Sequence, residues 1–162
     1  MPSLQRTRSE MLIDAVWRTV FRVGFRVIRV WWYFRRPQHE GALVAIYVGR
    51  ALLLVKSSYR AAWNFPGGSV RPGETPEAAA QREVAEEIGL PSCTLVPAGT
   101  ASGVWDWRRD RVHFFELRLD RLPDLRLDHR EIIGAQLVEP DELPGYALTE
   151  AVAAYVGGKL GS

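Results

Sequence analysis

GGSVRPGETPEAAAQREVAEEIGL, residues 67–90, is the stretch around which this chain of 162 residues is organised. Thr75 suits the N-cap of a helix, and Pro76 suits the first helical position, where its missing N–H costs nothing. Gly89 is suited to end the helix in a left-handed conformation. The stretch therefore predicts a glycine-rich turn followed by a helix over residues 76–88.

Three carboxylates fall on one side of this predicted helix. Glu83, Glu86 and Glu87 are three and four residues apart, a spacing that places them on one face. Like charges at this spacing repel, and a hard divalent cation such as Mg²⁺, which prefers oxygen ligands, would remove the repulsion. The alternative interpretation is a solvated acidic face. The neighbouring glycine turn and Arg82 favour the metal site.

The fixed positions of this stretch resemble a known family motif. They are Gly68, Glu74, Arg82, Glu83, Val84, Glu86, Glu87, Gly89 and Leu90, and Trp63-Asn64-Phe65-Pro66-Gly67 precedes them. This pattern resembles the Nudix box at every fixed position. The resemblance implies a Nudix hydrolase, an enzyme that cleaves a diphosphate linkage in a nucleoside diphosphate joined to another group.

The resemblance also implies a fold and a domain layout. It covers about residues 40–156 and implies an α/β fold, the Nudix-type α/β/α sandwich with a mixed sheet. A helix between hairpins favours the same mixed sheet covered by helices. We therefore expect a Nudix hydrolase domain at 40–156. Outside the resemblance, the residue pattern itself predicts a basic amphipathic N-terminal helix at 1–36, and a C-terminal tail is expected at 157–162.

Within the box, the resemblance assigns roles to single residues. Glu83, Glu86 and Glu87 would coordinate Mg²⁺, or Mn²⁺ as a substitute, with the carbonyl of Gly67 as a further ligand. The residue matching Glu83 sometimes also transfers a proton, and the identity of the general base stays open. The resemblance gives Arg82 a positioning role beside these carboxylates. Gly68, Glu74 and Gly89 would support the arrangement.

Nudix enzymes often recruit another acid from a loop distant from the box. Glu131 is the first candidate, because it precedes a late strand as such acids do. Asp128 and Glu116 are weaker alternatives. His129 could accept a proton, but a loop histidine is more often simply solvated.

Substrate contacts are less well defined by the sequence. Aromatic and cationic side chains that suit a base or a phosphate are Tyr59, Arg60, Trp63, Trp105, Trp107, Arg108 and Arg109. Taken alone, each aromatic residue is more often a packing residue than a ligand contact. The pattern does not distinguish nucleoside triphosphates, ADP-ribose-like sugars, dinucleotides and capped RNA ends. The expected partner is a small-molecule diphosphate substrate.

Charge is distributed unevenly along the chain. The net charge is +2, but residues 1–36 hold eight arginines against two acids and carry +6, so the rest carries −4. A basic segment on an acidic body favours an anionic surface as the partner of that segment and makes a general nucleic-acid-binding protein unlikely. Cys93 is the single cysteine, which indicates a reducing, cytoplasmic location.

Residues 9–34 read as one long helix with arginines on one side and apolar residues around most of the rest. The arginines recur too often for a transmembrane span. Two interpretations stay open. The helix packs on its own domain or on a partner subunit, giving a homodimer, or it lies peripherally on an anionic membrane at its inner face.

Outside the box, apolar runs predict the remaining elements. A hairpin is expected from 42–48 and 51–55 around Gly49-Arg50, after a polar connection at 38–41. Further predictions are strands at 95–103, 112–119 and 134–138, a loop at 105–111 and a helix at 149–156.

Two rival functions are kept beside the Nudix hydrolase. One is a membrane-associated hydrolase of a lipid-linked diphosphate, suggested only by residues 9–36. The other is a ligand-binding sensor without turnover, which the intact set of box glutamates disfavours.

Overall fold

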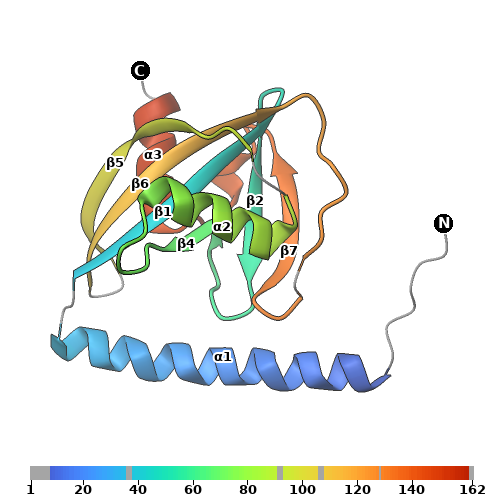
Figure 1. Ribbon diagram of the computed structural model, residues 1–162, viewed down its shortest axis with the longest axis vertical. Helices are drawn as coiled ribbons and strands as arrows, with labels where there is room; N and C mark the ends of the chain where they lie inside the picture. The colour runs from blue at the N-terminus through green and yellow to red at the C-terminus, as the bar shows by residue number, and fades with distance from the viewer. Residues whose placement is uncertain (1–7, 36–37, 91–92, 106–107, 128, 161–162) are drawn as a thin grey trace.

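The computed structural model describes residues 8–35, 38–90, 93–105, 108–127 and 129–160, which form a mixed sheet between helices (Figure 1). The elements, in chain order, are α1 (Arg8–Arg35), β1 (Gln38–Val48), β2 (Ala51–Ser57), β3 (Trp63–Asn64), β4 (Gly67–Ser69), α2 (Pro76–Ile88), β5 (Val96–Trp105), β6 (Arg108–Leu119), β7 (Ile132–Val138), the 3₁₀ turn η1 (Leu143–Gly145) and α3 (Glu150–Leu160).

The sheet has the strand order β3-β2-β1-β6-β5, with β4 paired to β1 and β7 paired to β2. β1 and β6 run parallel, whereas the other pairs are antiparallel. The predicted hairpin of β1 and β2 is confirmed, with Val48 opposite Ala51 and Gly49 at a φ of 61°. The sheet is therefore mixed, as predicted.

Alternate residues of β1 enter two separate cores, as expected for a strand buried on both faces. Val44 and Ile46 pack with Val84 and the rest of the buried side of α2. Leu43 and Ala45 pack with the buried side of α3. The two helices thus cover opposite faces of the sheet, and the α/β/α sandwich is confirmed (Figure 1).

Helix α1 is present as predicted, and it lies alongside one end of the sandwich (Figure 1). Its inner side contacts the loops that follow β2 and precede β7. Arg18 Nε donates to the carbonyl of His129 at 3.0 Å, and Arg22 Nε donates to the carbonyl of Ser58 at 3.1 Å. None of the helices in the described part of the chain combines the length and apolar character needed to cross a membrane.

Three boundary predictions were wrong. The polar residues 38–41 belong to β1, because they pair with residues 109–112 of β6. Most of the predicted loop at 105–111 is strand, since β6 begins at Arg108. Helix α3 runs through Leu160, so most of the predicted tail at 157–162 is helical. In each case the polar or glycine-containing composition concealed pairing or helix continuation that tertiary contacts stabilise.

Candidate active site

The ends of α2 are fixed by local chemistry, and this sets the positions of its three glutamates. Thr75 Oγ1 accepts the N–H of Ala78 at 3.2 Å, and Pro76 occupies the first turn. Gly89 ends the helix at a φ of 73°, and its N–H donates to the carbonyl of Ala85. Both predicted helix ends are confirmed. Glu83, Glu86 and Glu87 therefore share one stretch of helical surface.

Two glycines of β4 let the carboxylates approach the backbone closely. The N–H of Gly67 donates to Glu87 Oε2 at 2.9 Å. A Cβ placed on Gly68 would lie 2.6 Å from the carboxyl carbon of Glu83. A side chain at either position would occupy the space that the carboxylates or the neighbouring strand require, so the turn needs glycine for contact as well as conformation.

Arg82 holds the acidic residues of the box together. Its Nε and Nη2 donate to the two carboxylate oxygens of Glu74 at 2.9 and 3.0 Å, a bidentate pair. Its Nη1 lies 2.5 Å from Glu83 Oε1 and 3.5 Å from Glu86 Oε2. Nη2 also donates to the carbonyl of Ser69 at 3.1 Å. Arg82 thus ties α2 to β4, which agrees with the positioning role expected from the sequence.

The Glu74–Arg82 pair predicts a pH-dependent part of the stability. The side-chain hydrogen bond from Arg82 is the main cause that lowers the pKa of Glu74 from 4.5 to about 2. Because the folded-state pKa is lowered, this stabilisation is complete above the unfolded pKa and is lost as the pH falls towards 2. In Arg82→Lys we expect the pKa of Glu74 to rise. Carboxylate NMR titration with melting curves from about pH 2 to 6 measures this, and an unchanged pKa would contradict it.

The donor set of this face fits a hard divalent cation. Carboxylate oxygens of Glu83, Glu86 and Glu87, together with a backbone carbonyl at Gly67, are ligands that Mg²⁺ and Mn²⁺ prefer. Within the described residues, no three His, Cys, Asp or Glu side chains form a preassembled metal cluster. Instead, Glu83 and Glu86 face Arg82, and Glu87 faces the N–H of Gly67. The metal assignment therefore stays a prediction.

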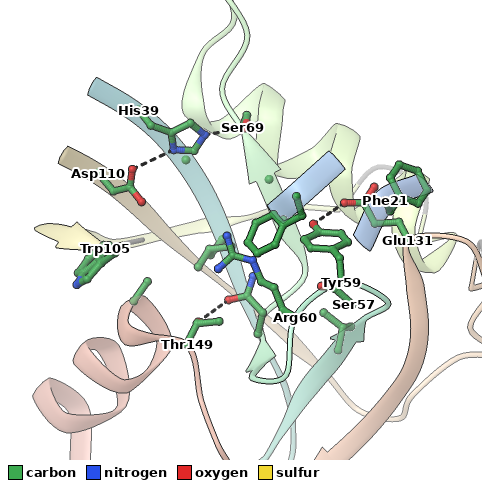
Figure 2. Close-up of a pocket in the computed structure, with 18 of the residues that line it drawn as sticks. Phe21, His39, Ser57, Tyr59, Arg60, Ser69, Trp105, Asp110, Glu131 and Thr149 are labelled. Atoms are coloured by element: carbon green, nitrogen blue, oxygen red, sulfur yellow. Dashed lines mark hydrogen bonds and ion pairs between the residues drawn. The ribbon is translucent and has the colours of Figure 1, made fainter. Parts of the chain in front are cut away.

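A pocket of about 800 Å³ opens beside this face. Gly67, Gly68 and Glu87 line it on the side of the box, and Glu131 lines it from the loop before β7 (Figure 2). Tyr59 donates its hydroxyl to Glu131 Oε1 at 2.7 Å. Burial, and secondarily the carboxylate of Glu131, raise the pKa of Tyr59. The tyrosine therefore stays protonated and orients Glu131.

The pocket also contains some of the predicted substrate-binding residues. Tyr59, Arg60 and Trp105 line it (Figure 2). Trp63 does not; its ring packs edge-on against Tyr146, with centroids 5.8 Å apart. Arg109 is exposed and also lies outside the lining.

The remaining candidates divide between other surfaces and undescribed positions. Trp107 and Asp128 lie outside the described residues, as does the side chain of Arg108. Glu116 is not part of the pocket lining; it accepts from Tyr155 at 2.7 Å and pairs with Lys159 at 2.8 Å. Among the acids proposed beyond the box, Glu131 is the one that the described structure brings to the pocket.

Sequence reasoning missed a polar group at the opposite end of the pocket. His39 Nε2 lies 2.8 Å from Ser69 Oγ, and its Nδ1 lies 3.5 Å from the buried Asp110 (Figure 2). His39 and Asp110 are register partners on the parallel strands β1 and β6. They are far apart in the sequence, so no local spacing signals their proximity. Residues of α1 also line the pocket, which the sequence did not indicate.

Comparison with known proteins shows which protein family this chain resembles. Residues 37–156 match the NUDIX domain. The chain is 45% identical over 106 residues to a putative 8-oxo-dGTP diphosphatase of Bacillus subtilis, covering 65% of this chain and 69% of the relative. It is 33% identical over 96 residues to a human diphosphoinositol polyphosphate phosphohydrolase, covering 59% of this chain and 46% of the relative. The chain thus spans less than half the length of that relative, and 35% of two mouse diphosphoinositol polyphosphate phosphohydrolases.

Crystal structures of related proteins share the fold. A MutT protein of Methanosarcina mazei superposes with a TM-score of 0.64 at 22% identity, covering 76% of this chain and 93% of that protein. A MutT NUDIX hydrolase of Burkholderia pseudomallei gives 0.65 at 22% identity, covering 74% and 95%. The sandwich, the box and the domain match lead to one conclusion: this chain belongs to the Nudix hydrolase family.

Proposed function

We propose that this protein hydrolyses a diphosphate linkage in a nucleoside diphosphate derivative with the help of Mg²⁺. The observation that carries the proposal is the convergence of Glu83 and Glu87 on the backbone of β4, beside a pocket large enough for a nucleotide-sized ligand. The names of relatives support the reaction class, since they include a putative 8-oxo-dGTP diphosphatase and an RNA pyrophosphohydrolase.

The proposed chemistry divides between the metal and the side chains. Bound to the box carboxylates and the Gly67 carbonyl, a divalent cation would neutralise the diphosphate and acidify a water. Arg82 keeps Glu83 and Glu86 in place, and the Gly67 N–H does the same for Glu87. Glu131, held by Tyr59, offers a carboxylate across the pocket that can complete the site or accept a proton.

Hydrolysis assays test this function directly. We expect hydrolysis of one member of a panel of nucleoside triphosphates, nucleotide sugars, dinucleotides and 5′-triphosphate RNA, in Mg²⁺ or Mn²⁺ and not in chelator. The product would be a nucleoside monophosphate for the first three classes, and pyrophosphate with 5′-monophosphate RNA for the last. Glu131→Gln should lower kcat while the melting temperature changes little, because the amide oxygen still accepts from Tyr59. The exposed Glu139, at the other end of β7, gives the control Glu139→Gln. Unchanged kcat in Glu131→Gln would remove this residue from the site.

The outer side of α1 is apolar and exposed, which bears on both partner interpretations. Exposed residues there that do not line the pocket are Ile13, Val16, Val23, Val27 and Val30. A homodimer would bury this row, and an anionic membrane would receive it in the headgroup region. Cytoplasmic location stays the prediction from the sequence in either case.

Sizing and vesicle co-sedimentation together distinguish a homodimer from a membrane contact. We expect a salt-insensitive dimer in sizing experiments if the row packs on a second copy, because apolar burial does not depend on ionic strength. Co-sedimentation with anionic vesicles that weakens as salt is raised supports the membrane instead. Val23→Glu together with Val27→Glu should abolish either association. A monomer that ignores anionic vesicles at low salt contradicts both.

A further inference from the structure

Helix α1 forms one wall of the active-site pocket. The pocket-lining residues of this helix are Val20, Phe21, Gly24, Phe25, Ile28 and Trp31. None of them carries a charge, although four arginines occur between Arg18 and Arg29. The helix therefore presents an apolar surface to whatever occupies the pocket, which Glu87 of the box also lines.

Polar contacts fix the position of α1 relative to Tyr59 and Glu131. Arg18 and Arg22 donate to backbone carbonyls of His129 and Ser58, and these acceptors are two residues from Glu131 and next to Tyr59 respectively. The buried carboxylate of Asp14 also pairs with Arg130 at 3.3 Å. The arginines of the inner side thus anchor the helix, and the apolar residues between them face the pocket.

Aromatic contacts extend the apolar wall onto the domain. The rings of Phe25 and Tyr59 have centroids 5.0 Å apart, and the Phe21 ring lies 6.4 Å from that of Tyr59. The Arg60 guanidinium lies 4.9 Å from the centroid of Phe25, a cation–π contact. Figure 2 shows Phe21 and Arg60 on either side of Tyr59. The surface suits a flat or extended uncharged group.

The charges of the pocket oppose a heavily phosphorylated ligand. Among the described lining residues, Arg60 and His39 are the basic side chains, whereas the acidic ones are Glu87, Asp110, Glu131 and Glu150. Each further phosphate would need its own cationic partners in such a site, because charge-assisted hydrogen bonds from arginine or lysine are what hold phosphate groups. A metal at the box would serve the diphosphate alone.

Resting on the proposed diphosphate hydrolysis, we infer that the substrate is a diphosphate or triphosphate whose organic group is uncharged and has an apolar surface, and that this surface binds against α1. The flat face of a purine base has such a surface, and so does an isoprenoid chain, as in the lipid-linked alternative raised by the sequence. A substrate with several additional phosphates, such as a diphosphoinositol polyphosphate, is excluded by the same charges. Human and mouse relatives carry that compound in their names, so the inference separates this chain from them.

A comparison of kcat/KM for three compounds tests the substrate class. Purified full-length protein with Mg²⁺ is given a purine nucleoside triphosphate, farnesyl diphosphate and a diphosphoinositol pentakisphosphate. We expect kcat/KM for one of the first two to exceed that for the third at least about 100-fold, as unpaired phosphates are rejected strongly. The better of the first two identifies the source of the apolar group. Preference for the inositol compound overturns the inference.

Variants on two sides of the same helix test the role of α1. Phe21→Ala should raise KM about 10-fold or more with a small change in kcat, since removing apolar contacts costs about that factor. Phe21→Leu, which keeps an apolar side chain, should recover most of the loss. Val23→Ala and Val27→Ala, exposed and outside the pocket lining, are matched controls and should leave KM unchanged. An unchanged KM in Phe21→Ala, with the helix retained by circular dichroism, overturns the proposal.

Binding measurements distinguish failure of this inference from failure of the proposed function. Methylene-bisphosphonate analogues of the three compounds resist hydrolysis, so calorimetry reports affinity alone. If neither these compounds nor any member of the nucleotide panel is hydrolysed, the proposed function fails, but tighter binding of an apolar analogue, weakened in Phe21→Ala, still supports the pocket assignment. If hydrolysis occurs but the inositol analogue binds best, the pocket assignment fails by itself.

Discussion

Glu87→Gln should lower the turnover of this enzyme at least about 100-fold at saturating Mg²⁺, because replacing groups that merely orient metal ligands already costs about 10- to 100-fold. Glu87 is buried, accepts the N–H of Gly67 and lines the pocket. The glutamine can keep that hydrogen bond through its amide oxygen, but it loses the negative charge that a hard cation requires. The melting temperature in metal-free buffer should therefore change little while kcat collapses.

The first turn of the same helix supplies the control. Glu77→Gln changes an exposed glutamate on α2 that does not line the pocket, and its kcat should equal that of the wild type. Steady-state kinetics over a range of Mg²⁺ concentrations make the comparison. Wild-type turnover in Glu87→Gln would show that the carboxylate is structural only, and the metal assignment would then fall.

Gly67→Ala should strongly lower the free energy of unfolding. Gly67 has a φ of 137°, a region open essentially to glycine alone, and its Cβ would lie 2.2 Å from the carbonyl oxygen of Ala42. Backbone strain of this kind costs about 1–3 kcal/mol, and forcing atoms into a packed strand costs about as much again. Together these amount to about 2–6 kcal/mol, which reaches the lower end of the free energy of unfolding of a typical domain, about 5–15 kcal/mol.

Urea unfolding of two further glycine variants tests whether the destabilisation is specific to Gly67. Gly145→Ala meets no atom within 4 Å and should unfold at the wild-type midpoint. For Gly68→Ala the three atoms nearest the new Cβ all belong to the Glu83 carboxylate, a movable side chain, so we expect the fold to survive and activity to fall. A Gly67→Ala protein that unfolds like the wild type would contradict the close approach of β4 to β1.

The box could be predicted from the sequence because its signals are local. Thr75 and Gly89 fix the ends of α2 by contacts within a few residues, and the spacing of the glutamates follows from the helix itself. The hairpin around Gly49 is local in the same sense. These elements were predicted correctly because each is determined by neighbouring residues.

The rest of the site depends on contacts between distant segments. His39 meets Asp110 only because β1 and β6 run parallel in one register, and nothing near either residue encodes that pairing. Residues 38–41 look like a polar connection and become strand because β6 pairs with them. The place of α1 against the pocket likewise depends on carbonyl acceptors at Ser58 and His129. Composition cannot reveal such acceptors.

The two sides of α1 have a thermodynamic consequence. Its inner side lines the pocket, and its outer side is exposed and apolar. Suppose that a partner binds the outer side more tightly when α1 is docked on the domain, as the ligand does in the pocket. The partner then raises the affinity for the ligand by the same factor by which the ligand raises the affinity for the partner. Occupancy of the catalytic pocket and association of the protein with its surroundings would then form a single coupled equilibrium.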